Sequence, residues 1–469
     1  MLSTRWSIAS SSACARAASR STWVSRKPST RPAPSRPASD EHAALRLRAA
    51  RARARARARA PAPAQVAMKP RPSLPSAPFV AVAGLSARML AQSAARAGLR
   101  VAALDVFGDR DTREASELWF DIGGGPLSID AERLVAALER TARLPGLIGW
   151  IDGSGLEPFV ARLCGMPRLP RFIGNPVEAS AAVREPRRFF ALLDALEIAH
   201  PPVVFAPPAV AHGWLVKRAD GCGGTHIEPA AAFGDPRIPA QIYFQRRRGG
   251  RSLSALFIAA FGHARVLGFA EQLTCEMGNL PFVHAGSIGP IDLPLTVQAR
   301  VHAAIAALCA QTRLTGINSC DFLLDGDAFE LLEINTRPSS TMTLYETASP
   351  HAWPRGLLAC HIEACRLGRL PAAPTPAAAP WRAGQQVLFA PHPFTVSQSF
   401  SDACLHDPRC RDVPMPGTRI ETGQPVCTLL VRAASVDAVR YALDAQRAFV
   451  LQRIDTCHEP DYAFIQCHS

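Results

Sequence analysis

The clearest alternation of apolar and polar positions lies in residues 316–341. Residues 320–324 alternate around Phe322, and a second apolar run occupies residues 328–334. Asp325 and Gly326 lie between the two runs, and an Asp-Gly pair in that place is typical of a tight hairpin turn. The pattern therefore predicts a β-hairpin.

A different pattern opens the body of the chain. Apolar runs at 79–83 and 99–105 flank a segment of helical composition at 89–97, which stops at Gly98. This order predicts a βαβ unit in an α/β domain over residues 78–165. A third strand is predicted at 147–151, and the loop 152–155 follows it at the carboxyl edge, where ligands tend to bind. A G-x-G-x-x-G pattern is missing after Gly84, so dinucleotide binding is not supported.

The middle and end of the chain contain further periodic segments. We predict helices at 187–196, 297–308, 353–367 and 436–451, and strands at 214–217, 252–261, 266–270, 386–389 and 426–431. Glu271 and Gln272 are expected to end the strand that begins at 266. Residues 279–290 and 417–423 are predicted as loop or turn. Residues 371–380 have the proline content of a linker.

Charge is concentrated in residues 1–67. The chain of 469 residues has a net charge of +13, and this segment holds 14 Lys and Arg against 2 acidic residues, which leaves +1 for the remainder (13 − 12). Its Arg-Ala alternation offers no apolar face, so this tail is predicted to be disordered. Two interpretations stay open: an organellar transit peptide, or upstream sequence wrongly included before a start at Met68. We favour the start at Met68, and we expect the protein to be cytoplasmic.

Composition excludes several classes of function. The body is nearly neutral and has no basic motif with interleaved aromatic residues, which argues against nucleic-acid binding. No uninterrupted apolar run is long enough to span a bilayer. The thirteen cysteines follow no disulfide spacing, which favours reduced thiols. Cys404, His406 and Cys410 form one cluster, but their spacing matches no zinc pattern.

The hairpin carries candidate metal ligands. Glu333 and Asn335 are two residues apart and share a strand face, which Asp321 can reach from the other strand. Two carboxylates and an amide oxygen beside Arg337 would suit Mg²⁺ that holds nucleotide phosphates, because this ion takes few protein ligands. The alternative is an ordinary hairpin whose edge carries solvated charges.

A phosphate-binding loop is predicted upstream of the hairpin. The strand at 214–217 ends in Lys217, and Gly221, Gly223, Gly224 and Thr225 follow it. Glycines let backbone N–H groups approach phosphate oxygens. Lysine occurs at only three positions in the whole chain, and the other 49 basic residues are arginine. Lys217 therefore stands out as a compact ammonium suited to phosphate.

These motifs resemble the ATP-grasp superfamily, in which biotin carboxylase is included. The resemblance rests on Glu333-Ile334-Asn335-Thr336-Arg337 with Asp321 twelve positions upstream, and on Lys217 with its glycine loop. It implies an α/β and α+β multidomain fold: a pre-ATP-grasp domain at 78–165, a two-lobed ATP-grasp domain at 185–370, and a small β-rich lobe at 381–455. It implies ATP with Mg²⁺ or Mn²⁺ as cofactors, Asp321, Glu333 and Asn335 as metal ligands, and Lys217 and Arg337 as catalytic groups. Gln245 and Arg246 would lie at the adenine.

The resemblance also implies an ATP-dependent ligase that joins a carboxylate to an amine through an acyl phosphate, with a homodimer as the oligomeric state we consider. Residues 84–88 and 105–109 resemble a branch of predicted carboligases associated with one-carbon metabolism. One feature departs from the family, because the position of its first lysine falls on Pro186, and Arg187 or Arg188 would have to supply the charge. Two alternatives are a biotin-carboxylase-like reaction through carboxyphosphate and a non-catalytic ATP-binding regulator. His284 is a further candidate for the acceptor site.

Overall fold

The structure is a computed structural model that describes residues 77–456 except 126, 235–238, 240 and 373–380. All of these belong to one compact unit, Pro72–Ser469. The tail 1–67 and most of the linker 371–380 lie outside the described residues. The helices are α2 Arg88–Arg96, α3 Arg110–Ala115, α4 Ala131–Thr141, α5 Val160–Cys164, α6 Val177–Arg184, α7 Pro186–Ala195, α8 Leu295–Thr312, α9 Met342–Ala348, α10 Leu357–Leu367, α11 Gln398–His406, α12 Val436–Thr456 and the short 3₁₀ helix Ala230–Ala232.

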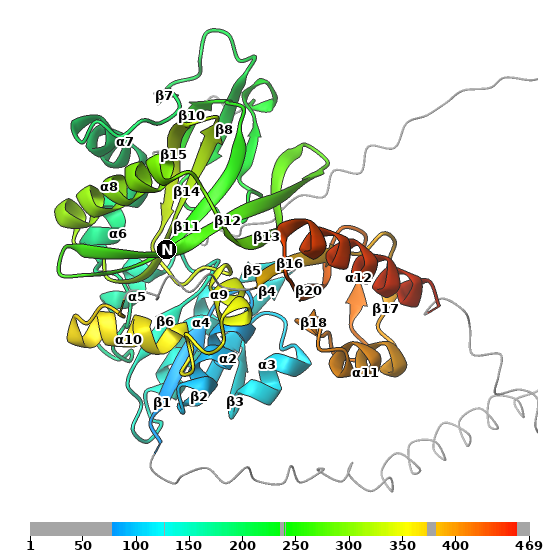
Figure 1. The fold of residues 1–469 in the computed structure, drawn as a ribbon. Helices are drawn as coiled ribbons and strands as arrows, with labels where there is room; N and C mark the ends of the chain where they lie inside the picture. Colours follow the sequence, from blue (N-terminus) through cyan, green and yellow to red (C-terminus); the bar gives the residue numbers. More distant parts are fainter. Residues whose placement is uncertain (1–76, 126, 235–238, 240, 373–380, 457–469) are drawn as a thin grey trace, which may run out of the picture. The chain divides into compact units, whose positions relative to one another are not determined.

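The first sheet is parallel and has the order β3-β2-β1-β6 (Figure 1), with β1 Phe79–Ala83, β2 Arg100–Asp105, β3 Leu118–Asp121 and β6 Trp150–Asp152. The predicted βαβ opening is confirmed as β1, α2 and β2. Helix α4 begins where the Asp130 side chain accepts hydrogen bonds from two backbone N–H groups of its first turn. A small hairpin, β4 Gly123–Gly125 with β5 Ser128–Ile129, precedes it.

The second sheet is small and antiparallel, with the order β7-β10-β8-β9. Its strands are β7 Val203–Val204, β8 Trp214–Arg218, β9 Ile227–Pro229 and β10 Ile242–Arg246. Because side chains alternate along a strand, the pairing of Lys217 with Tyr243 places both on one face, together with Gln245. Val216 and Phe244 point the other way, into an apolar cluster with Ala230.

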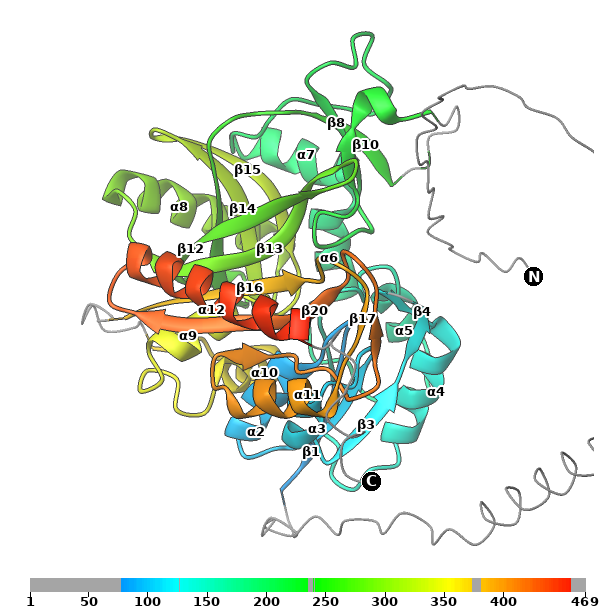
Figure 2. The ribbon, with the colours of Figure 1, turned by 90° about the vertical axis from the view of Figure 1, so that its right-hand side faces the viewer.

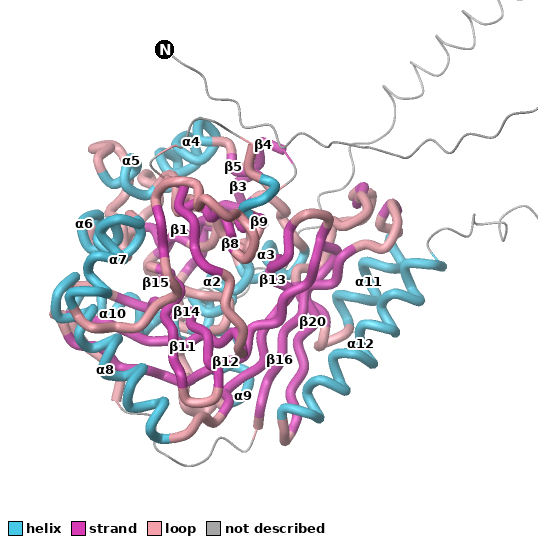
Figure 3. The backbone as a smooth tube through the Cα atoms, turned by 90° about the horizontal axis from the view of Figure 1, so that it is seen from above, coloured by secondary structure: helices cyan, strands magenta, loops and turns pink. Residues whose placement is uncertain are grey.

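The third sheet has eight antiparallel strands in the order β15-β14-β11-β12-β13-β16-β20-β18. Its strands are β11 Arg251–Ala260, β12 His263–Met277, β13 Leu280–Ile291, β14 Gly316–Asp325, β15 Ala328–Asn335, β16 Arg382–Phe389, β18 Cys410–Arg411 and β20 Pro425–Ala433. Figure 3 shows this sheet as a continuous run of strands from β15 across to β20. Strands β17 Phe394–Thr395 and β19 Arg419–Ile420 form a separate two-stranded sheet, and in the sequence they alternate with the last strands of the large sheet.

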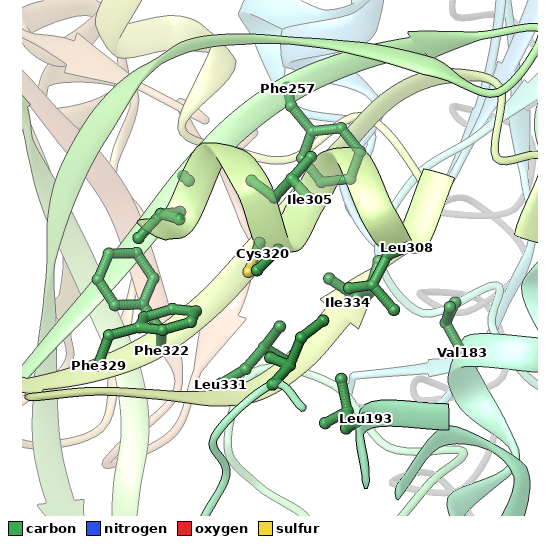
Figure 4. Close-up of a cluster of buried hydrophobic side chains, with 14 of the residues drawn as sticks. Val183, Leu193, Phe257, Ile305, Leu308, Cys320, Phe322, Phe329, Leu331 and Ile334 are labelled. Carbon is green, nitrogen blue, oxygen red and sulfur yellow. The ribbon is translucent and has the colours of Figure 1, made fainter. Parts of the chain in front are cut away.

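Two apolar cores hold the large sheet in place. On one face, α6, α7 and α8 pack against β14 and β15, and Figure 4 shows Phe322, Leu331 and Ile334 among Leu193 and Leu308. On the other face, Leu256 and Ile258 of β11 contact residues of α2 and α10. The first sheet and the large sheet therefore share a core, which fixes the loops of one against the other.

Two sequence predictions about this sheet were wrong. The strand expected to end at Glu271 and Gln272 continues to Met277, and residues 279–290, expected as a loop, form β13. The glycines and prolines of this segment suggested a loop, but each strand is paired along its length with its neighbours. Register shifts between β12 and β13 accommodate the irregular residues.

Strands β16, β20 and β18 extend the large sheet, and α12 lies along β16 and β20 (Figure 2). Val439, Leu443 and Val450 of α12 join the apolar core beneath it. Within the described residues, no helix combines the length and the apolarity needed to cross a membrane.

Candidate active site

The predicted hairpin is confirmed as β14 and β15, and a β-bulge sets the face of its acids. The pairs from Asp325 with Ala328 to Phe322 with Leu331 are regular, but the register then shifts and Asp321 pairs with Glu333. Continued regular pairing would have placed Glu333 opposite Cys320, which is buried in the core. Because one extra residue reverses the alternation, the bulge turns Glu333 and Asn335 to the face of Asp321.

The three candidate metal ligands converge on this face. The Asn335 Nδ2 atom lies 3.1 Å from Asp321 Oδ2 and 3.3 Å from Glu333 Oε1. Asp321 also accepts a hydrogen bond of 2.7 Å from the Ser254 hydroxyl of β11. The structure therefore brings Asp321, Glu333 and Asn335 together.

The two carboxylates have different electrostatic surroundings. Burial and the charge of Glu333 raise the pKa of Asp321 to about 7. Burial also acts on Glu333, but His226, Lys217 and Arg184 lie near enough for their charges to lower its pKa. Two like charges share one buried site here, which is unfavourable until a cation separates them.

This donor set fits Mg²⁺. An amide N–H of Asn335 occupies the gap between the carboxylates, where a cation would lie, and a half-turn of the amide would present its oxygen instead. Two carboxylates and one amide are enough for an ion that takes its remaining ligands from phosphate and water. Among the residues that the structure describes, no group of three or more His, Cys, Asp or Glu side chains could hold a metal by itself.

Lys217 faces these acids from the small sheet. Its side chain is 5% exposed, and it forms no ion pair or hydrogen bond with any residue in the described part of the chain. Burial lowers the pKa of Lys217, while Glu333 and Asp321 act to raise it. A buried ammonium without a direct partner is costly, so its surroundings favour an anionic ligand between the two sheets.

The glycine loop after β8 rests on β13. The His284 N–H donates to the Gly223 carbonyl at 2.9 Å, and a methyl group at Gly224 would lie 1.8 Å from the Phe282 carbonyl oxygen. Gly221 has a similar constraint, because a side chain there would meet the His226 ring. The Thr225 hydroxyl donates to the Cys222 carbonyl at 3.1 Å, which holds the loop in a turn.

Gln245 and Arg246 differ in where they point. Gln245 is 2% exposed, and its buried Nε2 atom has no hydrogen-bond partner in the described structure. An unsatisfied buried amide is a place where a ligand acceptor could bind. Arg246 instead donates to the His212 carbonyl at 3.1 Å and lies over the Trp214 ring, so its side chain covers the turn before β8.

Arg337 is held by the first domain. Its Nε donates to Glu157 Oε1 at 2.7 Å, and both side chains are at most 10% exposed. Glu157 follows the loop 152–155, which was predicted at the carboxyl edge of the first sheet, and also accepts from the Gly155 N–H. Asp152 lies buried in the same loop with one oxygen that has no partner in the described structure, and burial together with Glu157 raises its pKa to about 7. Sequence reasoning found the loop but not Glu157.

The charge expected from Arg187 or Arg188 has a further candidate, Arg184, in the structure. Arg187 lies over the Phe205 ring, and Arg188 is half exposed near Glu178 and Glu185. Arg184, the last residue of α6, lines a pocket with Tyr243, Gly221 and Glu333, and donates to the Ala219 carbonyl. Pro186 begins α7, so the basic residue comes two positions before the expected place. A pattern anchored on the later helix could not find it.

The structure also shows where two further candidates from the sequence lie: His284, and the cluster of Cys404, His406 and Cys410. His284 lies on β13, where burial and the charge of Arg337 lower its pKa to about 4, so it is neutral beside the candidate site. Cys404 and Cys410 are buried in the core with Cys427, whereas the His406 ring bonds to the Asp402 carbonyl at the surface. These residues do not gather into a metal site among the described residues.

Comparisons with known proteins bear on the family and the fold. Residues 191–341 match the family model described as ATP-grasp domain. No curated protein matches the chain.

Several solved structures have a similar fold. The biotin carboxylase domain of Hydrogenobacter thermophilus 2-oxoglutarate carboxylase, solved with MgADP and bicarbonate, is 14% identical, covers 80% of this chain and 93% of its own, and gives a TM-score of 0.59. The L-amino acid ligase from Bacillus licheniformis is 15% identical over 81% and 97%, with a TM-score of 0.55. The N5-carboxyaminoimidazole ribonucleotide synthetase from Thermus thermophilus is 18% identical over 80% and 98%, with a TM-score of 0.53. The predicted fold class is confirmed.

Proposed function

Because this chain contains an ATP-grasp domain, we propose that it is an ATP-dependent ligase that activates a carboxylate and joins it to an amine or a similar nucleophile. The observation that carries the proposal is the buried Lys217, which faces Asp321 and Glu333 across the space between two sheets and has no direct partner among the described residues. A cation on one side and a pair of metal-binding acids on the other suit a polyphosphate between them.

The proposed reaction has two steps. A carboxylate oxygen of the substrate attacks the γ-phosphorus of ATP, the bond to the β–γ bridging oxygen breaks, and ADP leaves. The amine then attacks the acyl carbon, and inorganic phosphate leaves with the carboxylate oxygen. No side-chain nucleophile is needed, because positioning and charge stabilisation provide most of the catalysis in such phosphoryl transfers.

Each candidate residue has a place in this scheme. Lys217 and the backbone of the loop 221–225 would hold the β- and γ-phosphates, and Arg184 would add charge at the nucleotide side of Glu333. Asp321, Glu333 and Asn335 would hold Mg²⁺ or Mn²⁺, which supplies charge neutralisation at the phosphates. Arg337, fixed by Glu157, would stabilise the transferring phosphoryl group.

Two other functions are less well supported. A biotin-carboxylase-like reaction would use the same nucleotide site, and a carrier bearing biotin would have to come from another protein. A non-catalytic regulator was suggested by the missing lysine at Pro186, but Arg184 supplies a positive charge near that position. We further propose a role in the synthesis of a one-carbon-carrier cofactor, which rests only on the resemblance of residues 84–88 and 105–109.

Release of ADP from MgATP tests the proposal. Protein is incubated with a panel of carboxylates and amines, and ADP is measured for the native chain, for Glu333→Gln, and for the control Glu330→Gln. Glu330 lies on the same strand but is near Arg248 rather than at the site. We expect ADP release that depends on both substrates and falls at least about a hundredfold in Glu333→Gln only. Nucleotide binding without turnover on any pair would favour the regulator.

A further inference from the structure

A cavity of about 450 Å³ lies beneath α12, between this helix and strands β12, β13 and β16. Its size is typical of small-molecule sites. Leu443, Leu388 and Ile288 form an apolar floor, and each is at most 2% exposed. None of the residues assigned to the candidate active site lines this cavity among the described residues.

The charged groups of the cavity come from one face of α12. Arg440, Asp444 and Arg447 follow each other at intervals of four and three residues, which places them on the same side of a helix. Arg440 already has a partner, because its guanidinium donates to Glu271 at 2.5 Å, a carboxylate that it shares with Arg251. Asp444 and Arg447 are exposed to solvent, and they form no ion pair or hydrogen bond with any residue in the described ranges.

The strand side adds an unsatisfied acceptor. The Gln386 Oε1 atom is buried and has no hydrogen-bond partner in the described structure, and Gln386 lines the cavity. A buried carbonyl oxygen without a donor is unfavourable unless a ligand or water supplies one. As far as the described residues extend, the cavity thus offers one free cation, one free anion, one free acceptor and an apolar surface.

From this juxtaposition we propose that the cavity binds a small zwitterion of the amino-acid type, with an apolar side chain. Arg447 receives the carboxylate in a paired hydrogen bond, and Asp444 receives the ammonium group. Gln386 accepts a further hydrogen bond from the ligand, and the apolar side chain covers Leu443 and Leu388. A simple anion would leave Asp444 unmatched, and a simple amine would leave Arg447 unmatched.

The cavity is connected to the candidate metal site through β12. Glu271, which holds Arg440, is followed by Gln272, whose side chain accepts from the Ser252 hydroxyl at 2.7 Å and lies near enough to Asp321 to act on its pKa. Gln272 itself lines the cavity. An occupant of the cavity would therefore contact a side chain that lies near a candidate metal ligand, and the cavity would hold a ligand of its own, separate from those of the proposed ligase site.

Binding of L-leucine to the full chain without nucleotide tests the proposal by calorimetry. 4-Methylpentanoate and isoamylamine serve as probes that carry only one of the two charged groups. We expect saturable binding of L-leucine, at least about tenfold weaker binding of either single-charge probe, and at least about a tenfold loss in Arg447→Met and in Asp444→Asn. Thr274→Trp, which changes an exposed lining residue, should block the cavity without disturbing the core.

Two variants separate this site from others. Arg432→Met removes an exposed arginine that lies over Trp381, and should bind L-leucine as the native chain does. Lys217→Met should also leave this binding unchanged, although it disables the candidate phosphate site. Absence of saturable binding of L-leucine and of smaller α-amino acids would overturn the proposal, as would binding that survives all three cavity variants but is lost in Lys217→Met. Because no nucleotide is present, either result leaves the proposed ligase reaction untouched.

Discussion

At the scale of single residues, the candidate site presents buried cations that can still donate hydrogen bonds to a ligand. Lys217 is buried and has no ion pair with a described residue. Arg337 is fixed by Glu157 through its Nε and reaches Asn335 only at 3.4 Å, so its guanidinium can still donate to a ligand. A buried ammonium without a partner, such as that of Lys217, is unfavourable in the free protein and becomes favourable when phosphate or carboxylate binds.

Arg184 provides a test at this scale. Replacing it with methionine should raise the KM for ATP at least about tenfold, because a charged hydrogen bond to phosphate contributes about 1.5–3 kcal/mol. The matched control is Arg187→Met, because Arg187 lies over the Phe205 ring. Steady-state kinetics with varied ATP concentration measures the KM for ATP of both variants. Equal KM values in the two variants would show that α6 does not supply the missing charge.

Sequence reasoning identified several candidate site residues from their type and spacing. Asp321, Glu333, Asn335 and Lys217 were found in this way, and the structure brings them together. Glu157 and Arg184 were missed, because each reaches the site from a separate part of the fold and has no fixed spacing to the motifs. Only the packing of α6 and of the first domain against the hairpin shows where they point.

His361 gives a prediction about pH. Its Nδ1 accepts from the Ile317 N–H at 2.9 Å and its Nε2 bonds to the Ile173 carbonyl at 2.9 Å, and burial lowers its pKa to about 4. The folded state resists protonation, whereas the unfolded chain takes up a proton below its ordinary value of 6.5. The contribution of His361 to stability should therefore fall as pH decreases from about 6.5 to about 4, by about 3 kcal/mol.

Denaturant unfolding at several pH values measures this effect. In His361→Gln, the amide can still donate and accept but does not titrate, so the part of the pH dependence that comes from His361 should disappear. An unchanged slope in this variant would contradict the assignment of the neutral ring to the folded state.

At the scale of elements, the β-bulge in β15 makes the site possible. The sequence predicted both strands and the turn, but the predicted pattern contained no signal for the extra residue. Without the register shift between Asp321 and Phe322, Glu333 would face the core beside Cys320. Sequence periodicity therefore located the hairpin, while the pairing of β14 with β11 and the packing of Ile334 fix the register that aligns the acids.

The glycine loop gives a second prediction at this scale. In Gly224→Ala, the new methyl group would collide with the Phe282 carbonyl, so the loop would have to leave β13. In Gly223→Ala, no atom lies within 4 Å, and only the left-handed backbone at φ +63° is strained, by about 1–2 kcal/mol. The KM for ATP should rise at least about tenfold in the first variant and little in the second. A larger effect in Gly223→Ala would contradict the described contact.

At the scale of the whole described unit, buried ion pairs join the first domain to the C-terminal segment. Arg88 of α2 donates to Asp412 at 2.8 Å and lies 3.8 Å from Asp111, whose carboxylate accepts from the backbone N–H groups of Asp412 and Val413. Arg96 and Ser93 of the same helix bond to Glu346 of α9. The short helix α2 therefore contacts both α9 and the segment around Asp412. Sequence periodicity predicted α2 but could not predict these partners, which are hundreds of residues away.

Removing the Arg88 side chain tests this connection. Arg88→Ala should lower the free energy of unfolding by about 3–5 kcal/mol, because it leaves Asp412 and Asp111 buried without a cation. Arg355→Ala, which breaks an exposed pair with Glu363, should have almost no effect. Chemical denaturation of both variants measures the two free energies of unfolding. Similar small losses would show that the contact contributes little to stability.

The most direct test of the central claim follows the oxygen atoms of the reaction. Once a substrate pair is identified, the carboxylate substrate is labelled with ¹⁸O and incubated with MgATP, the amine and the native chain, and the inorganic phosphate is examined by mass spectrometry. If an acyl phosphate forms, one carboxylate oxygen leaves with the phosphate, so each phosphate released should carry one ¹⁸O atom. Release of unlabelled phosphate during product formation would contradict activation of the carboxylate by phosphoryl transfer.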